Sequence, residues 1–347
     1  MPLEILFAGN YEPDYNRTAI LRAGLLKLGH RVREYPFKGK SSAAGRELRA
    51  LAGAADFVFM PSFTHKEVSF VKKNSRGKKV VFDPLISRYM TKALDYANVW
   101  KYGLAALRAR LSDRSSMAAA DFVVTDTAAH LEWFHSNCGV PREKMGVLYI
   151  GNDFGSFFPG ERPAGDGRFV AGFYGSLNPL QGVVKILEAA RLLRAREDIL
   201  FRIVGDGFDY ARARAYAAEK RLPNVDFAGR VPQSGLREKI LGFDAALGIF
   251  GDTLKAGLVI PNKVYHYAAC RRPIITRDTP AIRELFAGGE DMVLTDGSPE
   301  SLAEAVLRLK DDPALAARLA ASAHDKIRTG YDEVQVAEKL LSFRGRC

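Results

Sequence analysis

The chain has 347 residues, of which 47% are hydrophobic and 26% are charged, and its formal net charge is +11. This length and composition predict about two globular domains with buried cores and exclude a disordered chain. No apolar run reaches the roughly 18 residues that a membrane-spanning helix needs. The first residues, MPLEILFAG, enter a strand pattern with no basic leader, so we expect no signal peptide and a cytoplasmic protein.

The cysteines and the charge distribution narrow the class further. Cys138, Cys270 and Cys347 lie far apart without metal-ligand spacing, which suits a reducing compartment. Residues 1–160 hold 23 Lys and Arg against 15 Asp and Glu, whereas the remainder holds 28 against 25. A basic first half indicates an anionic partner, such as a membrane surface or a phosphorylated acceptor; plain solubility is the alternative.

The first half alternates short apolar strands with helices. Strands are predicted at 3–8, 56–60, 79–82, 121–125 and 146–150. The helix at 17–28 places Ile20, Leu21, Leu25 and Leu28 on one face and stops at Gly29. Short apolar strands separated by helices are typical of a parallel sheet that is covered on both faces.

The alternation breaks at 151–167, a Gly- and Pro-rich segment without a period, and then restarts. The second half predicts strands at 169–174, 200–204, 225–228, 245–250, 274–276 and 292–294, and helices near 181–195, 209–221, 235–241, 262–270, 279–287, 299–310 and 313–329. We therefore predict an α/β protein with two doubly wound, Rossmann-like domains at 1–155 and 165–330 that face a cleft, and a terminal helix within 331–347 that packs back on the body. Ligands of such sheets bind beyond the carboxyl ends of the strands.

Two glycine-containing stretches follow predicted strands in the second half. The first, VGDGFDY at 204–210, has Gly205 and Gly207, but Tyr210 stands where a dinucleotide fingerprint needs its third glycine. A nucleotide loop and a tight strand-to-helix turn are equally good interpretations. The second, FYGSLNPLQG at 173–182, leads from a strand into a helix start, whose backbone N–H groups form an anion site.

Five motifs in order between about 146 and 330 resemble the C-terminal domain of retaining glycosyltransferases with the GT-B fold, family 4 in particular. They are YIGNDFGSFFP, GSLNPLQG, ILFRIVGDG, LPNVDFAGRVP and IPNKVYHYAACRRPIIT followed by TPAIRELF. The stretches VVFDPLISRYMTKALD and AAADFVVTDTAAHLEWF of the first half look like acceptor-domain segments of the same family.

The resemblance implies that the second domain holds a nucleotide-diphospho-sugar donor. Donor-binding candidates are Gly175, Ser176, Gln181, Gly205, Arg230, Val231, Leu258, Val259, Asn262, Lys263 and His266. Ser176 and Gln181 stand where the family usually has the Arg and Lys that hold the diphosphate, while His266 and Leu258 stand at two positions that often carry Glu. The resemblance implies neither a metal nor a cofactor, since no Asp-x-Asp pair is present to hold an ion.

Two residues of the IPNKVYHY stretch have open roles. We expect Lys263 to supply part of the charge that a buried diphosphate needs; its alternative is a solvated loop lysine. His266 can bond a ribose hydroxyl through a ring nitrogen, and the alternative is a residue that only packs between Tyr265 and Tyr267.

By the same resemblance the first domain is expected to bind the acceptor, and polar residues follow its predicted strands, where ligands of such sheets bind. Acceptor-binding candidates are Gly9, Tyr11, Asn16, Arg17, Ser87, Asp126 and Thr127, and the catalytic candidates are His65, Asp83 and His130. For each single residue a cap or turn is the commoner explanation; Asp126 and Thr127 could simply cap a helix.

Residues 96–114 are a membrane candidate. Trp100, Tyr102, Leu104, Leu107 and Leu111 alternate there with Lys101, Arg108, Arg110 and Arg114, as in basic helices that lie in a headgroup layer. The alternative is an ordinary domain helix whose leucines point inward.

These features together predict a metal-independent, retaining glycosyltransferase (a hexosyltransferase of cell-surface polysaccharide biosynthesis) with a glycan or lipid-linked acceptor. It would be cytoplasmic or peripheral at the inner membrane face, with no nucleic-acid partner. The alternatives are a catalytically impaired, glycosyltransferase-like binding or scaffold protein and a nucleotide-sugar epimerase on the same fold.

Overall fold

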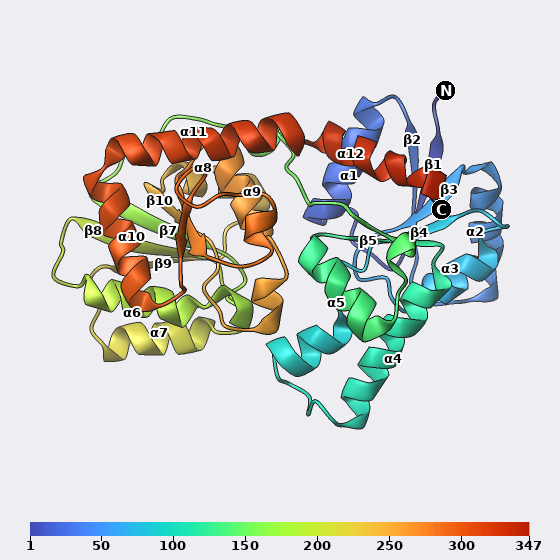
Figure 1. Cartoon of the computed structure of the whole chain (residues 1–347), viewed down its shortest axis with the longest axis horizontal. Coiled ribbons are helices and arrows are strands. Elements are labelled where there is room, and N and C mark those ends of the chain that lie inside the picture. The colour runs from blue at the N-terminus through green and yellow to red at the C-terminus, as the bar shows by residue number, and fades with distance from the viewer. Residues whose placement is uncertain (347) are drawn as a thin grey trace. The chain divides into compact units, whose positions relative to one another are not determined.

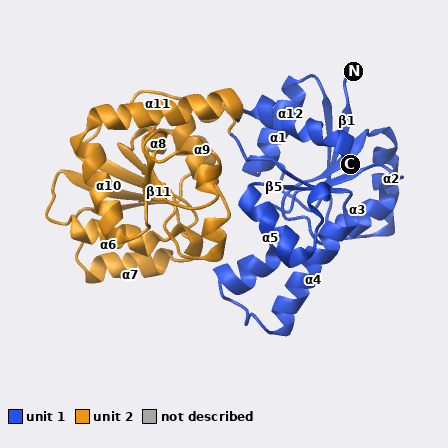
Figure 2. Cartoon of the chain, in the orientation of Figure 1, with its two compact units in different colours: residues 1–151, 331–347 blue, residues 152–330 orange. Residues whose placement is uncertain are grey.

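The computed structural model describes residues 1–346 of the chain, so Cys347 lies outside the described part. The chain forms two compact units (Figures 1 and 2). Unit 1 comprises Met1–Gly151 and the segment from Tyr331 onward, and unit 2 comprises Asn152–Gly330. The polypeptide therefore passes from one unit to the other twice.

Unit 1 is a six-stranded sheet with strand order β2-β1-β3-β4-β5-β6, in which every pairing is parallel. The strands are β1 (Glu4–Gly9), β2 (Arg31–Pro36), β3 (Phe57–Met60), β4 (Val80–Phe82), β5 (Phe122–Thr125) and β6 (Met145–Val147). The helices are α1 (Asn16–Lys27), α2 (Ser42–Ala54), α3 (Val68–Asn74), α4 (Leu104–Ala119), α5 (Ala128–Cys138) and α12 (Glu333–Ser342), with a π-helical segment at Met90–Asp95 and 3-10 turns at Arg142–Lys144 and Phe343–Arg346.

Unit 2 is a second six-stranded parallel sheet, with order β12-β11-β10-β7-β8-β9. Its strands are β7 (Phe169–Tyr174), β8 (Ile199–Val204), β9 (Val225–Gly229), β10 (Ala245–Leu247), β11 (Ile274–Arg277) and β12 (Val293–Thr295). Its helices are α6 (Val183–Leu192), α7 (Tyr210–Glu219), α8 (Gln233–Leu241), α9 (Asn262–Ala269), α10 (Pro299–Asp311) and α11 (Pro313–Gly330), with 3-10 turns at Pro179–Gln181, Leu254–Gly257 and Ile282–Glu284.

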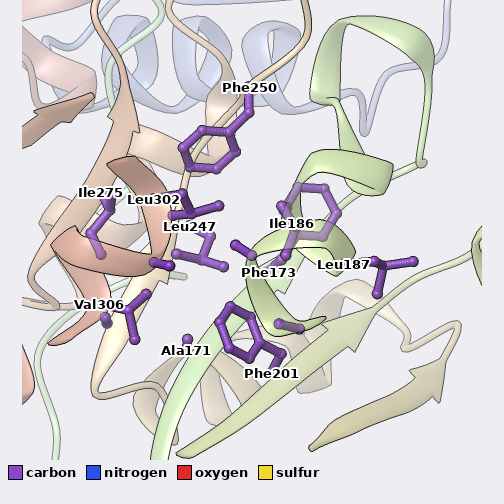
Figure 3. Close-up of a cluster of buried hydrophobic side chains, with 14 of the residues drawn as sticks. Ala171, Phe173, Ile186, Leu187, Phe201, Leu247, Phe250, Ile275, Leu302 and Val306 are labelled. Atoms are coloured by element: carbon purple, nitrogen blue, oxygen red, sulfur yellow. The ribbon is translucent and has the colours of Figure 1, made fainter. Parts of the chain in front are cut away.

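The core of unit 2 lies where the central strands meet α6 and α10. Phe173 of β7, Phe201 of β8 and Leu247 of β10 are fully buried among side chains of the two helices (Figure 3). These strands carry apolar residues at consecutive positions, as expected for a parallel sheet with helices on both faces. The two doubly wound sheets confirm the predicted fold class.

Two sequence predictions about the elements were wrong. The charged strand β2 was missed, because its alternating exposed residues at the sheet edge lack an apolar run. The helix expected at 279–287 is only the 3-10 turn Ile282–Glu284. The N–H of Ala281 donates to the carbonyl of Gly257 and that of Ala287 donates to the Asp291 carboxylate, so neither closes a helical turn.

Helix α12 closes unit 1 from the far end of the sequence. It packs against α1, where Gly24 lies so close that an added Cβ would stand 1.8 Å from the carbonyl oxygen of Glu333. The Glu333 carboxylate also pairs with Lys27. A capping box at Asp332 and Gln335 fixes the start of the helix.

Candidate functional site

The carboxyl ends of β7 and β10 form the topological switch point of unit 2. From β7 the chain continues to β8 on one side, and from β10 it continues to β11 on the other side. In such sheets this is where ligands bind. The segments that follow these two strands, including α9 after β10, contain most of the predicted donor-binding residues.

Glycines let these loops approach one another at backbone distance. A Cβ on Gly205 would lie 2.0 Å from the carbonyl oxygen of Gly175, and a Cβ on Gly207 would lie 2.0 Å from that of Ser176. Both glycines also have positive φ, +120° and +133°. The two glycines of VGDGFDY are therefore required by loop packing, and the nucleotide-binding role of this loop stays a prediction.

Gln181 fills the space above Gly175. Its side chain is buried, and a Cβ on Gly175 would stand 2.4 Å from Gln181 Oε1. The carbonyl of Gln181 accepts the N–H of Phe250, which ends β10 earlier than the sequence predicted and ties the loop before α6 to the one after β10. Within residues 1–346, no hydrogen bond reaches Gln181 Oε1. An unsatisfied buried amide oxygen of this kind is rare in folded proteins.

Lys263 is buried on α9 beneath the same loops. Its Nζ lies 3.6 Å from the centre of the Phe173 ring and donates no hydrogen bond to the described residues. Burial alone lowers the pKa of Lys263 well below its usual value. The alternative of a solvated loop lysine is therefore wrong.

His266 lies one turn further along α9 and is held by aromatic neighbours. Its ring stacks on Phe157 with centroids 3.7 Å apart, and Tyr174 Oη lies 2.6 Å from its Nδ1. Burial lowers the pKa of His266 to about 3, so the imidazole is neutral at physiological pH. The rings that stack on His266 are those of Phe157 and Tyr174. The ribose-binding role stays a prediction.

Hydrogen bonds of Tyr267 connect helix α9 to the switch point. The Tyr267 hydroxyl accepts the N–H of Tyr174, which ends β7, and donates to the carbonyl of Leu247, which ends β10. One helix therefore presents both Lys263 and His266 to the ends of the two central strands. The sequence contained no signal for the contributions of Phe157 and Tyr174.

The other donor candidates are spread more widely. Arg230 and Val231 follow β9, at the outer edge of the sheet, and Arg230 is exposed. The N–H of Leu258 donates to the carbonyl of Lys255, Val259 is buried, and Asn262 is the first residue of α9. Gly175, Ser176, Gln181, Gly205, Lys263 and His266 are the predicted residues that the structure gathers around β7.

In unit 1 the predicted residues gather at the ends of β1 and β4. Arg17 and Asp83 form a fully buried ion pair. Asp83 also accepts the Ser62 hydroxyl and the N–H of Leu85. A Cβ on Gly9 would lie 2.5 Å from Thr64 Cγ2, so Gly9 is required for packing.

The other catalytic and acceptor candidates are buried in separate networks. His130 Nδ1 lies 2.7 Å from Asp126 Oδ1, and Thr127 caps α5 through the N–H of His130. His65 Nε2 lies 3.7 Å from Asp113 Oδ1, and burial lowers the pKa of His65 to about 4. The roles of these residues in catalysis and acceptor binding stay predictions.

Asp113 is a residue that sequence reasoning missed. It accepts the Ser87 hydroxyl at 2.7 Å and the N–H groups of Arg88 and Tyr89 at 3.0 Å each. Ser87 is thus a structural partner of α4. The remaining acceptor candidates lie around α1: Tyr11 donates to the carbonyl of Phe7 at 3.4 Å, and Asn16 begins the helix.

Two features are absent from residues 1–346. These residues contain no group of three or more His, Cys, Asp or Glu side chains placed to hold a metal ion. None of their helices has both the length and the apolar character to cross a membrane.

Residues 168–312 match the family described as Glycosyl transferases group 1. Unit 2 therefore contains a region similar to the group 1 glycosyltransferases. The matched residues run from the start of β7 to the end of α10 and include the loops at the switch point.

Two curated relatives are glycosyltransferases by name. The chain is 27% identical over 248 residues to the D-inositol 3-phosphate glycosyltransferase of Thermomonospora curvata. The aligned residues cover 64% of this chain and 56% of that protein. It is 32% identical over 116 residues to the probable glycosyltransferase WbjE of Pseudomonas aeruginosa, 33% of this chain and 28% of that protein. The chain thus spans only about half, or less, of the length of these relatives.

The whole fold resembles GT-B enzymes of low sequence identity. HepE of Anabaena, crystallised with UDP and glucose, has a TM-score of 0.74 at 15% identity, over 99% of this chain and 100% of that one. Sucrose-phosphate synthase of Thermosynechococcus elongatus has a TM-score of 0.71 at 13% identity, over 100% of this chain and 99% of that one. The chain has the GT-B fold.

Proposed function

We propose that the chain is a retaining glycosyltransferase that moves a sugar from a nucleotide-diphospho-sugar to a glycan or glycolipid acceptor. The observation that carries this proposal is the family match at 168–312, which covers the loops gathered at the carboxyl ends of β7 and β10. The relatives support it, since one acts on an inositol phosphate by name and the HepE crystal holds UDP and glucose.

The charge of the site supports a diphosphate ligand. The Lys263 side-chain amine is buried and makes no hydrogen bond to residues 1–346, although it lies against the Phe173 ring. An anion beside it would satisfy its donors and favour its charged form. The start of α6 at Val183, next to Ser176 and Gln181, adds backbone N–H donors that attract anions.

For the chemical step we propose that the leaving diphosphate itself accepts the acceptor's proton, and that no metal ion is required. Stabilisation of the leaving group would come from Lys263 and from backbone donors. Turnover should therefore survive chelation by EDTA, whereas a loss of turnover that Mg²⁺ or Mn²⁺ restores would overturn the metal-independent mechanism.

The neutral side chains of Ser176 and Gln181 favour a second candidate, a donor-binding protein with impaired transfer. Neither side chain supplies the positive charge that a leaving diphosphate needs. Such a protein would bind nucleotide but release none from a donor.

One experiment separates these functions. UDP-, GDP- and dTDP-linked sugars are mixed with the full chain, and thermal shift and nucleotide release are measured with and without a panel of glycan and glycolipid acceptors. A transferase binds one donor class and releases nucleotide faster with an acceptor; binding without release in every mixture would leave the impaired protein. Conversion of the donor's sugar without an acceptor would indicate an epimerase. No shift with any donor would overturn all three.

A further inference from the structure

Helix α4 of unit 1 carries its leucines on the outside. Leu104, Leu107 and Leu111 are 72%, 51% and 54% exposed, whereas Ala106, Ala109, Asp113, Ser116 and Met117 are buried. The leucines follow the spacing i, i+3, i+7 that places residues on one face of a helix. The expectation that these leucines point inward is therefore wrong.

Two aromatic residues precede the helix and extend its apolar face. Trp100 is 73% exposed and Tyr102 is 72% exposed, and their rings meet edge to face with centroids 5.9 Å apart. Single exposed apolar residues are ordinary, but five large ones within 12 residues of sequence, Trp100 to Leu111, mark an interaction surface.

The orientation of α4 is fixed from its buried side. Asp113 receives hydrogen bonds from the segment Ser87–Tyr89, and the helix packs against α3 and α5 (Figure 1). A rotation that turned the leucines inward would break the bonds to a buried carboxylate, which costs more than leaving leucines exposed.

The charges around this surface have one sign. From Met90 to Ala119 the exposed charged side chains are all cationic: Lys92, Lys101, Arg108, Arg110 and Arg114. The acidic residues of the same stretch, Asp95 and Asp113, are both buried. An anionic partner is favoured, because no exposed carboxylate in the stretch opposes it.

We propose that this surface, the α4 face, docks on an anionic lipid bilayer. It consists of Trp100, Tyr102, Leu104, Leu107 and Leu111 together with the five cations. Leucine and aromatic side chains enter the boundary between headgroups and acyl chains, while Lys and Arg remain at the phosphate level. A second copy of the chain is a poorer partner, because a symmetric contact would bring the same cations against one another.

Docking is independent of the proposed transferase activity and is measured without a donor. The full chain is sedimented with vesicles of 30% phosphatidylglycerol and 70% phosphatidylcholine, and with vesicles of phosphatidylcholine alone, at low and at high salt. We expect binding to the anionic vesicles that weakens as salt rises, and little binding to neutral ones. Absence of binding to anionic vesicles at low salt would overturn the proposal.

Matched variants separate the α4 face from the overall positive charge. Replacing Leu104, Leu107 and Leu111 with Ser should weaken binding at least tenfold, while Leu26→Ser, at an exposed leucine of α1, leaves it unchanged. Arg108→Gln with Arg114→Gln should weaken it roughly 25-fold, as two cations near an anionic surface would. The pair Arg31→Gln and Arg46→Gln, exposed elsewhere in unit 1, is the control. Equal losses in variant and control would contradict a defined face.

Tryptophan fluorescence gives a second test. The chain has 2 Trp, so Trp133→Phe leaves Trp100 as the sole tryptophan. Anionic vesicles should shift its emission to shorter wavelength, because the ring leaves water. An unshifted spectrum with bound protein would place the contact elsewhere. Light scattering during gel filtration checks for a dimer: one that forms through these leucines without vesicle binding would replace the bilayer with a second copy.

Discussion

At the scale of single residues, His266 shows how burial fixes the charge state of a predicted ligand-binding residue. Its ring lies between Phe157 and Tyr174 and is neutral, because burial lowers its pKa to about 3. The unfolded chain should titrate this group near 6.5, so it binds more protons than the folded chain between these two values. Stability from His266 is therefore complete above pH 6.5 and is lost as pH falls towards 3.

The loss of stability with falling pH gives a prediction for His266→Gln, which keeps a neutral hydrogen-bonding side chain at every pH. Wild type should lose about 2 kcal/mol of unfolding free energy through this group between pH 7 and pH 5, and the variant should lack that loss. Urea unfolding followed by circular dichroism at both pH values measures the difference. Identical pH dependence in the two proteins would mean that His266 is not held neutral by the fold.

Lys263 is the second residue whose charge state matters. Since burial lowers its pKa, an anionic nucleotide bound beside it should raise that pKa and draw a proton from solution. Calorimetric titration with the preferred nucleotide in Tris and in HEPES should show uptake by wild type and none by Lys263→Met. Lys239→Met, at an exposed lysine of α8, should keep the uptake. If Lys263→Met takes up protons as wild type does, the ammonium does not meet the diphosphate.

At the scale of elements, loop packing at the switch point sets the geometry of the site. Gly207→Ala should lower the unfolding free energy by more than about 2 kcal/mol, because its Cβ would meet the backbone of Ser176 at a strained φ. Gly229→Ala is the matched control: its φ is also positive, +67°, but nothing lies within 4 Å. It should cost about 1 kcal/mol. Urea unfolding ranks the two, and an equal cost would show that the loops can separate freely.

Most strands and helices could be predicted from the sequence, whereas several contacts between them could not. Every strand of unit 2 was predicted, because each is a run of apolar residues bounded by turn signals. β2 was not, since an edge strand with alternating charges has no such run. In the site, the five motifs located the loops and α9, but the stacking of Phe157 on His266 joins residues 109 positions apart, beyond the reach of local patterns. The outward leucines of α4 were equally hidden, because their orientation depends on the buried bonds of Asp113.

At the scale of the whole molecule, the last segment of the chain, from Tyr331 onward, belongs to the same unit as the first. Helix α12 comes after all of unit 2 in sequence, yet it completes unit 1 by covering α1. Unit 1 is therefore completed by a segment that follows all of unit 2 in the sequence, and the stability of unit 1 should depend on this segment more than that of unit 2 does.

Removal of the segment after Gly330 tests this dependence. Both tryptophans, Trp100 and Trp133, belong to unit 1, so their fluorescence reports the unfolding of that unit alone. We expect truncation to lower the unfolding free energy of unit 1 by several kcal/mol, because α1 would expose the face that α12 buries. The tryptophan transition should therefore move to a lower urea concentration. The part of the circular dichroism transition that comes from unit 2 should stay in place. In the full-length chain Gly24→Ala should act in the same direction, since its Cβ would meet the backbone of Glu333. A truncated chain whose tryptophan transition coincides with that of the full chain would show that α12 is dispensable to unit 1.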